Sequence, residues 1–327
     1  MKRRAFDRTG VQVTPIGLGT WQLGGTDWGD VDEQHALDTL RAAVEGGVNF
    51  FDTADVYGLG RSEELIGKFL KETSETVFVA TKLGRFPEPG WPENFSLESM
   101  RSHTEASLRR LGIETIDLTQ LHCIPPDLLR QGEVFESLRT LKREGKIKHF
   151  GVSVETDEEA QVCLKQEDLS SLQIIFNIFR QKPIELFADA KQKGVAIIVR
   201  LPLASGLLSG KYTKGTKFAP TDHRSYNREG QKFNVGETFA GLPFEKGVEL
   251  ADALKPLVPE GMTLAQMSLR WTIDFDAVSV TIPGARDAAQ ARANIKTAEL
   301  DPLSDELHGR LRKFYEMQVA AHIRGPY

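Results

Sequence analysis

Short apolar runs alternate along the chain with longer stretches in which apolar residues recur at helical spacing. Several of the runs are apolar throughout, which is typical of parallel strands buried on both faces. The pattern predicts eight strands, at residues 16–20, 49–51, 77–80, 115–121, 148–152, 172–176, 195–199 and 278–282.

Helical spacing fills most of the intervals between these runs. Ser96 stands where a helix N-cap is expected, and several glycines stand where helices should end. The predicted helices span residues 33–45, 62–70, 97–111, 133–144, 185–193, 264–273 and 304–315.

This alternation indicates repeated β-α-β units. Eight strands in 327 residues favour a closed (β/α)8 barrel. Periodicity alone does not separate a barrel from a doubly wound open sheet, which is the competing architecture. Because no Pro- or Ser-rich linker divides the chain, we expect a single domain over residues 1–327.

Composition and charge exclude several classes of protein. Hydrophobic residues make up 40% and charged residues 27%, the balance of a globular protein. With 41 basic and 46 acidic residues, the chain lacks the basic excess of nucleic-acid-binding proteins. No apolar stretch reaches the ~20 residues of a membrane span, and two cysteines suit a reducing compartment. We expect a cytoplasmic protein with neither nucleic acid nor membrane as a partner.

Several well-known motifs are missing from the sequence. Gly17 and Gly19 begin a dinucleotide-binding pattern that lacks its third glycine. There is no Walker A sequence and no nucleophile elbow. The seven histidines show no metal-ligand spacing, so no metal site is expected.

Residues 204–243 form an unusually long connection after the seventh predicted strand. Between positions 211 and 232 it carries six basic residues, opposed by Asp222 and Glu229. It is either a solvated surface loop or a flap over an anionic ligand, and the sequence leaves both open.

Ionisable side chains follow three successive predicted strands. Asp52 ends the second strand, Lys82 the third and His122 the fourth, and Tyr57 lies in the loop after Asp52. Taken singly, each residue has a structural explanation, as a cap, a solvated lysine or a packed histidine. At adjacent carboxyl ends of barrel strands, however, they can converge on one pocket.

Together these four side chains have a coherent chemistry. A tyrosine with a pKa of ~10 is a poor acid at neutral pH, and a nearby ammonium group lowers that pKa. A buried ammonium group in turn needs a carboxylate partner. We therefore expect Lys82 and Asp52 to tune Tyr57 as a proton donor, and His122 to orient a carbonyl oxygen.

Characteristic motifs follow one another in order at residues 15–21, 51–58, 62–67, 117–122, 145–148, 151–153, 202–212 and 282–286. In content and order they resemble the aldo-keto reductase family over nearly the whole chain. The segment Pro283-Gly284-Ala285-Arg286 is similar to the cofactor segment of bacterial-type members.

The resemblance implies a (β/α)8 TIM barrel with an N-terminal β-hairpin and extra helices, and reduction of aldehydes or ketones by NADPH. It implies that Asp52, Tyr57, Lys82 and His122 are catalytic, and that Trp21, Trp28, Tyr57 and His122 contact the substrate. The cofactor contacts that it implies are Gly19, Thr20, Trp21, Asp52, Ser153, Gln173, Arg200, Leu203, Ser205, Gly206, Leu208, Lys211, Gly284, Arg286, Gln290 and Asn294.

Arg286 offers a fork of donors for the 2′-phosphate of NADPH, next to a helix expected to start near Asp287. Gln290 and Asn294 lie one helical turn apart and can face the same ligand. Without the resemblance, a surface arginine beside a polar helix face is the simpler interpretation.

Two residues depart from the family pattern. Val154 stands where the family usually has an asparagine, so its side chain cannot hydrogen-bond the nicotinamide carboxamide. Arg200 stands where the family usually has an aromatic ring under the nicotinamide. Its guanidinium can stack on the ring or reach the pyrophosphate.

Three functions fit these observations. The first is reduction of a small-molecule carbonyl compound, by a protein for which a monomer is favoured. The second is the same site run in reverse, as a sugar or polyol dehydrogenase. The third is a cofactor-sensing regulatory subunit of a membrane channel, against which the complete set of four catalytic residues argues.

Overall fold

The computed structural model describes residues 1–29 and 31–327, and its centre is a ring of parallel strands. Neighbouring strands pair in chain order from β3 to β10, and bridges from Ile16 to Thr281 and from Gly19 to Gly284 join the last strand to the first. This closure confirms the predicted (β/α)8 barrel and excludes the open sheet. The strands are β3 (Leu18–Gly19), β4 (Phe50–Asp52), β5 (Phe78–Leu83), β6 (Ile116–His122), β7 (Ile147–Ser153), β8 (Ser171–Ile175), β9 (Ala196–Arg200) and β10 (Val278–Thr281).

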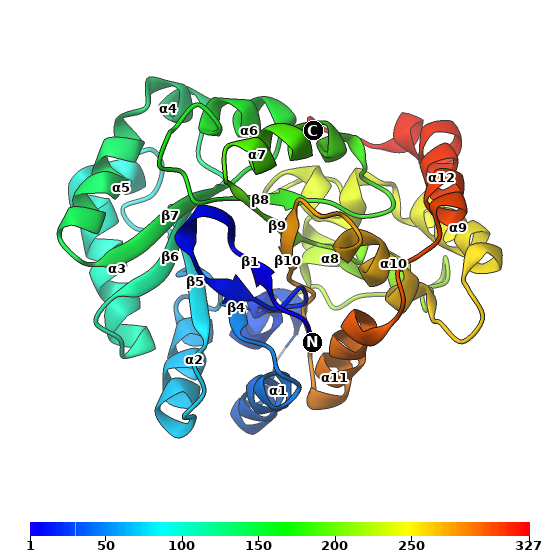
Figure 1. The fold of residues 1–327 in the computed structure, drawn as a ribbon, viewed down its shortest axis with the longest axis horizontal. Coiled ribbons are helices and arrows are strands. Elements are labelled where there is room, and N and C mark those ends of the chain that lie inside the picture. Colours follow the sequence, from blue (N-terminus) through cyan, green and yellow to red (C-terminus); the bar gives the residue numbers. More distant parts are fainter. Residues whose placement is uncertain (30) are drawn as a thin grey trace.

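Helices surround the strands (Figure 1). They are α1 (Glu33–Glu45), α2 (Arg61–Glu72), α3 (Leu97–Leu111), α4 (Pro126–Gln131), α5 (Glu133–Arg143), α6 (Asp157–Cys163), α7 (Phe187–Gln192), α8 (His223–Tyr226), α9 (Phe244–Leu254), α10 (Leu264–Ile273), α11 (Ala288–Lys296) and α12 (Asp305–Phe314). Short 3₁₀ segments include Trp21–Gly24, Lys182–Leu186, Ala204–Ser209, Val235–Glu237 and Phe239–Gly241, and a π-helical turn, Tyr315–Val319, follows α12.

All eight predicted strands are present, and α1, α3 and α10 have the predicted bounds. The helix predicted at 185–193 is shorter than expected. Pro183 lies in a 3₁₀ segment, and the α-helix begins only at Phe187. Helices α4, α6, α8 and α9 were not predicted.

A hairpin at the N-terminus closes one end of the barrel. Strands β1 (Arg4–Ala5) and β2 (Gln12–Val13) pair antiparallel, and Figure 1 shows the dark-blue hairpin crossing in front of the central strands. Phe6 packs its ring 5.6 Å from that of Phe50 and 5.3 Å from that of Phe78, measured between centroids. These two rings begin β4 and β5, so the hairpin covers the amino ends of the strands.

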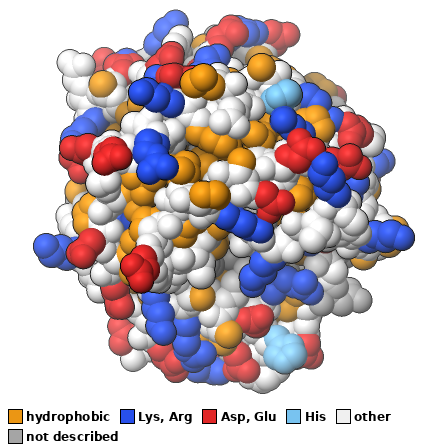
Figure 2. All heavy atoms as spheres, turned by 90° about the vertical axis from the view of Figure 1, so that its right-hand side faces the viewer, with side chains coloured by type: hydrophobic (Ala, Val, Ile, Leu, Met, Phe, Trp, Pro, Cys, Tyr) orange, Lys and Arg blue, Asp and Glu red, His pale blue; other side chains and the backbone are white. Residues whose placement is uncertain are grey.

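Figure 2 shows the face that carries α9, α10 and α12. Lysines and arginines are interspersed there with aspartates and glutamates, and apolar side chains gather toward the middle. Among the described residues, no helix is both long enough and apolar enough to cross a membrane.

Candidate active site

A cavity of about 1300 Å³ lies at the carboxyl ends of the barrel strands. Asp52 of β4, His122 of β6, Gln173 of β8 and Arg200 of β9 line it. The strand order alone thus brings together side chains that are far apart in the sequence, as expected for this fold.

Lys82 connects the predicted catalytic residues. Its Nζ lies 2.5 Å from Oδ1 of Asp52, and it donates to the Tyr57 hydroxyl at 3.3 Å and to the carbonyl oxygen of Thr53 at 2.9 Å. Lys82 and Asp52 are buried, with side chains 1% and 3% exposed. The His122 ring lies 5.9 Å from the Tyr57 ring, nearly perpendicular to it. The four residues therefore form one group at the cavity.

Two glutamines hold the second oxygen of Asp52. Nε2 of Gln173 donates to Oδ2 at 2.8 Å, and Nε2 of Gln120 donates to the same atom at 3.2 Å. The carboxylate is thus oriented from both sides. Gln120 was not predicted as a site residue, although it lies two residues before His122 on β6, on the same face of the strand.

Burial sets the protonation states of this group. Burial raises the pKa of the Tyr57 phenol, and the opposing effect of Lys82 is smaller, so the phenol stays protonated at neutral pH. Lys82 does lower the Tyr57 pKa, as expected, but burial outweighs this effect and the net shift is upward. Burial lowers the pKa of Lys82, but the Asp52 carboxylate and Tyr57 raise it more, so Lys82 keeps its charge.

His122 is held neutral. Burial lowers its pKa well below the ordinary value, and the charges of Arg85, Lys82 and Arg200 add to this effect. Its Nδ1 is buried and has no hydrogen-bond partner among the described residues. A neutral imidazole of this kind has one N–H that can donate to a substrate oxygen.

Aromatic rings form the wall beside Tyr57. Trp21 lies nearly parallel to the Tyr57 ring at 5.8 Å and meets Trp28 edge-on at 5.5 Å, so the two predicted substrate contacts lie beside the phenol. His223 and Phe233 were not predicted to lie here, and their rings lie 4.7 Å and 6.3 Å from that of Trp21. Both come from the segment 204–243, whose course could not be predicted.

The segment 204–243 forms one side of the cavity. Lys211, Tyr226, Lys232 and Glu237 all line it. Lys214 points elsewhere and pairs with Glu249 at 2.5 Å. The structure thus favours a flap over the cavity rather than a solvated surface loop.

The cavity brings together most of the residues predicted to contact the cofactor. Ser153, Leu208 and Asn294 are not part of its lining, and Asn294 instead donates to the carbonyl oxygen of Gly284 at 3.1 Å. The predicted residues that do line it are Gly19, Thr20, Trp21, Asp52, Gln173, Arg200, Leu203, Ser205, Gly206, Lys211, Gly284, Arg286 and Gln290.

These residues fit a nicotinamide dinucleotide. Tyr57, His122 and two basic side chains, Lys211 and Arg286, line the same cavity. A Cβ added to Gly284 would meet the amide group of Gln22, so that flexible side chain would have to move aside. The α11 helix begins next to Arg286, with Asp287 as its N-cap, as predicted.

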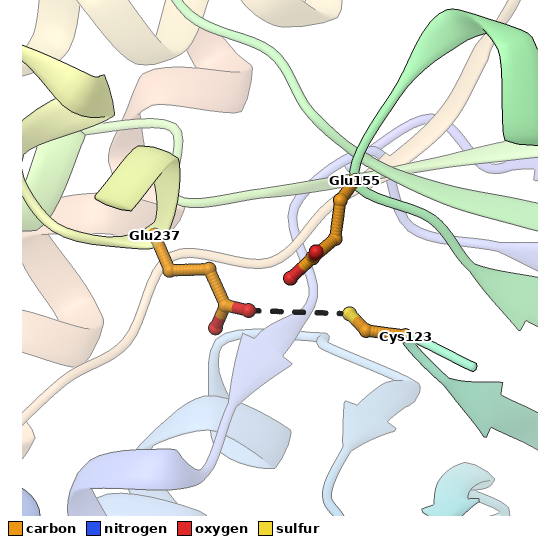
Figure 3. Close-up of side chains that lie close together, drawn as sticks. All are labelled: Cys123, Glu155 and Glu237. Atoms are coloured by element: carbon orange, nitrogen blue, oxygen red, sulfur yellow. Dashed lines mark hydrogen bonds between the residues drawn. The ribbon is translucent and has the colours of Figure 1, made fainter. Parts of the chain in front are cut away.

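Arg200 is held in place where β9 ends at the cavity. Its Nη2 donates to the carbonyl oxygen of Val154 at 3.1 Å, and its Nη1 lies 3.7 Å from Oε2 of Glu237. Arg200 and Val154, the two residues that depart from the family pattern, thus contact each other. Figure 3 shows the Glu155 and Glu237 carboxylates facing each other beside Cys123.

Comparison with known proteins gives one consistent result. The model of the Aldo/keto reductase family matches residues 15–316. The aldo-keto reductase YhdN of Bacillus subtilis is 32% identical over 301 residues, which cover 90% of this chain and 87% of that protein. The NADH-specific methylglyoxal reductase of Escherichia coli is 30% identical over 323 residues, which cover 93% and 95%. The structure of a glycerol dehydrogenase from Gluconobacter oxydans matches with a TM-score of 0.79 and 29% identity, covering 100% of this chain and 97% of that one.

Proposed function

Because the chain belongs to the aldo/keto reductase family, we propose that it reduces the carbonyl group of a small aldehyde or ketone with NADPH, and that Tyr57 is the general acid. One observation carries the proposal. Lys82 Nζ contacts both the Asp52 carboxylate and the Tyr57 hydroxyl, beside a neutral His122, at the cavity.

The side chains have distinct roles in this reaction. The N–H of His122 donates to the carbonyl oxygen and orients it toward Tyr57. The phenol then gives its proton to that oxygen as negative charge develops, and Lys82 stabilises the phenolate that remains. Asp52, oriented by Gln173, balances the Lys82 charge. NADPH, when bound, supplies the hydride.

The cofactor is proposed to lie along the cavity. Gln173 and Arg200 would hold the nicotinamide, and Arg286 would hold the 2′-phosphate in the bacterial-type segment Pro283-Gly284-Ala285-Arg286. Arg286 supports NADPH over NADH, because it brings positive charge to the place proposed for the 2′-phosphate. The Escherichia coli relative is NADH-specific by name, so both cofactors have to be compared. The remaining proposed contacts that line the cavity are Gly19, Thr20, Trp21, Leu203, Ser205, Gly206, Gly284 and Gln290.

A second function is oxidation of a polyol by the same residues. The structural match to a protein named glycerol dehydrogenase favours it. Comparing the rates of carbonyl reduction and alcohol oxidation at one pH separates the two directions.

The test is the rate at which NADPH absorbance is lost with a simple aromatic aldehyde, in the unmodified protein and in Tyr57→Phe. We expect the rate to fall by about 10²- to 10⁴-fold in the variant, the usual contribution of a general acid, with NADPH binding retained. Tyr315→Phe is the matched control, because its hydroxyl bonds to Tyr327 away from the cavity.

A Tyr57→Phe variant that turns over as fast as the control would overturn the assignment of the acid. A protein that binds neither NADPH nor NADH would overturn the proposed function altogether.

A further inference from the structure

Arg200 places a guanidinium group at the reacting end of the cavity. It ends β9 and lines the cavity with Tyr57 and His122, and its side chain is 10% exposed. Its Nη2 lies 3.7 Å from Sγ of Cys123, the residue after His122. In the proposed reaction the carbonyl group meets Tyr57, His122 and the nicotinamide ring at once. That ring must therefore lie near Arg200.

Two arginines and two glutamates form this part of the wall, and Figure 3 shows the two carboxylates. Arg85 Nη2 lies 2.7 Å from Oε1 of Glu237 and 3.1 Å from Oε1 of Glu155. Although Glu237 is buried, Arg85 and Arg200 hold its pKa below the ordinary value, so it is ionised. Burial and the Glu237 charge raise the pKa of Glu155, which reduces its negative charge near neutral pH.

The net charge of this cluster is therefore positive. Two permanently charged guanidinium groups face one full carboxylate and one partly protonated carboxyl group. The Cys123 thiol adds no negative charge, because burial raises its pKa.

One donor of Arg200 is unused. Its Nε is buried and has no hydrogen-bond partner among the described residues, while Nη2 is fixed on the carbonyl oxygen of Val154. An unpartnered buried donor costs free energy, which a ligand acceptor in the cavity recovers. The carboxamide oxygen of nicotinamide is an acceptor of this kind.

We propose that Arg200 makes the cavity bind the reduced nicotinamide cofactor more tightly than the oxidised one. The oxidised ring carries a positive charge and the reduced ring is neutral, whereas the rest of the cofactor is the same. Repulsion between like charges is strong in a partly desolvated cavity. In a mixture of the two forms, most of the protein therefore binds the reduced cofactor. The oxidised cofactor that the reaction produces dissociates readily. This inference rests on the proposed function, which puts the nicotinamide at this end.

The experiment measures equilibrium Kd values for NADPH and NADP⁺, and in parallel for NADH and NAD⁺, by fluorescence titration. The quantity of interest is the ratio of the oxidised to the reduced Kd. In the unmodified protein we expect a ratio of about ten or more, and in Arg200→Met a fall of about tenfold, equivalent to ~1.4 kcal/mol. Most of that fall comes from tighter binding of the oxidised form.

Two further variants distinguish the effect of the Arg200 charge on the Kd ratio from a structural effect of the substitution. Arg286→Met removes a positive charge at the phosphate end, so it weakens both forms equally and leaves the ratio unchanged. Glu237→Gln removes the negative charge beside Arg200, so it raises the ratio, opposite to Arg200→Met. Even if Arg200→Met does not fold, the ratio of the oxidised to the reduced Kd in Glu237→Gln tests the proposed role of the Arg200 charge.

A ratio near one in the unmodified protein would overturn the inference. The same is true if Arg200→Met weakens both forms by one factor, or if Glu237→Gln leaves the ratio unchanged. All three results leave cofactor binding intact and so leave the proposed function standing. Failure to bind any of the four nucleotides overturns the proposed function as well.

Discussion

Asp55 is a buried carboxyl group whose two oxygens have no hydrogen-bond partner among the described residues. Burial raises its pKa to about 8, and the nearby Glu63 carboxylate adds to the rise, against the smaller effect of Arg110. In the unfolded chain the same group ionises near pH ~4. The native state therefore loses stability as pH rises from about 4 to about 8, and no further above that.

Asp55→Asn removes this penalty while keeping the size of the side chain. We expect it to raise the free energy of unfolding, with a gain that grows between about pH 5 and about pH 8 by up to ~4 kcal/mol. Chemical denaturation at both pH values measures the gain. The control is Asp301→Asn, at an exposed carboxyl group. If the free energy of unfolding changed with pH in the same way in the unmodified protein and in Asp55→Asn, the prediction would be contradicted.

The sequence was sufficient to group Asp52, Tyr57, Lys82 and His122, because each follows a predicted strand and parallel strands end at one edge. Their protonation states were not predictable. The pKa of Tyr57 depends on burial beneath side chains such as Trp21 and on the segment 204–243, whose positions arise only in the folded chain.

At the scale of elements, a set of ion pairs fastens the segment 204–243 over the cavity. Arg85, just after β5, bonds to Glu237 of this segment and to Glu155 after β7. Asn234 donates to Glu155 at 3.2 Å. Arg85 thus connects three loops that meet at the cavity.

Arg85→Met leaves Glu237 buried with a weaker set of partners, and removing one member of a buried pair costs about 3–5 kcal/mol. We expect amide hydrogen exchange at Glu237 and Thr238 to become at least about tenfold faster, because their turns open more often. The control is Arg41→Met, whose partner Glu72 is exposed on α2. Unchanged exchange at these amides would show that the ion pairs do not hold the segment.

Regular elements were predictable wherever local signals were strong. Helices α1, α3 and α10 have N-caps at Asp32, Ser96 and Thr263 that fix their first residues. Helix α6 carries an equally readable signal, a capping box of Thr156 and Glu159, which the sequence analysis overlooked. The segment 204–243 shows no periodic pattern of apolar residues. Single turns and ion pairs define its course, and these leave no such pattern in the sequence.

At the scale of the whole molecule, ring closure is the property that the sequence could not decide. A barrel and an open sheet have the same alternation of strands and helices. They differ in the order of the strands and in whether the first strand meets the last. Here β3 meets β10, two strands from opposite ends of the chain. Three backbone hydrogen bonds mark that seam. The Gly17 N–H donates to the Thr281 carbonyl oxygen at 2.9 Å, the Gly19 N–H to that of Pro283 at 3.1 Å, and the Thr281 N–H to that of Pro15 at 2.9 Å.

Closure also bears on the prediction of a single domain. In one cooperative domain, damage at the seam lowers the stability of the opposite side of the ring, where β6 and β7 pair. In two domains the damage stays near the seam. Gly19→Ala destabilises the seam. Its Cβ would lie 2.8 Å from the carbonyl oxygen of Ile282, a backbone atom that cannot shift without moving the chain.

We expect Gly19→Ala to destabilise the protein by about 1–3 kcal/mol. In a single domain the slowest-exchanging amides of β6 and β7 then lose protection by the same free energy as amides beside the seam, since both open only by global unfolding. Hydrogen exchange measured strand by strand makes the comparison. Gly309→Ala, in α12 with nothing near its Cβ, is the matched control and should be neutral or stabilising. If β6 and β7 kept their protection while the seam lost it, the chain would consist of two independently stable parts.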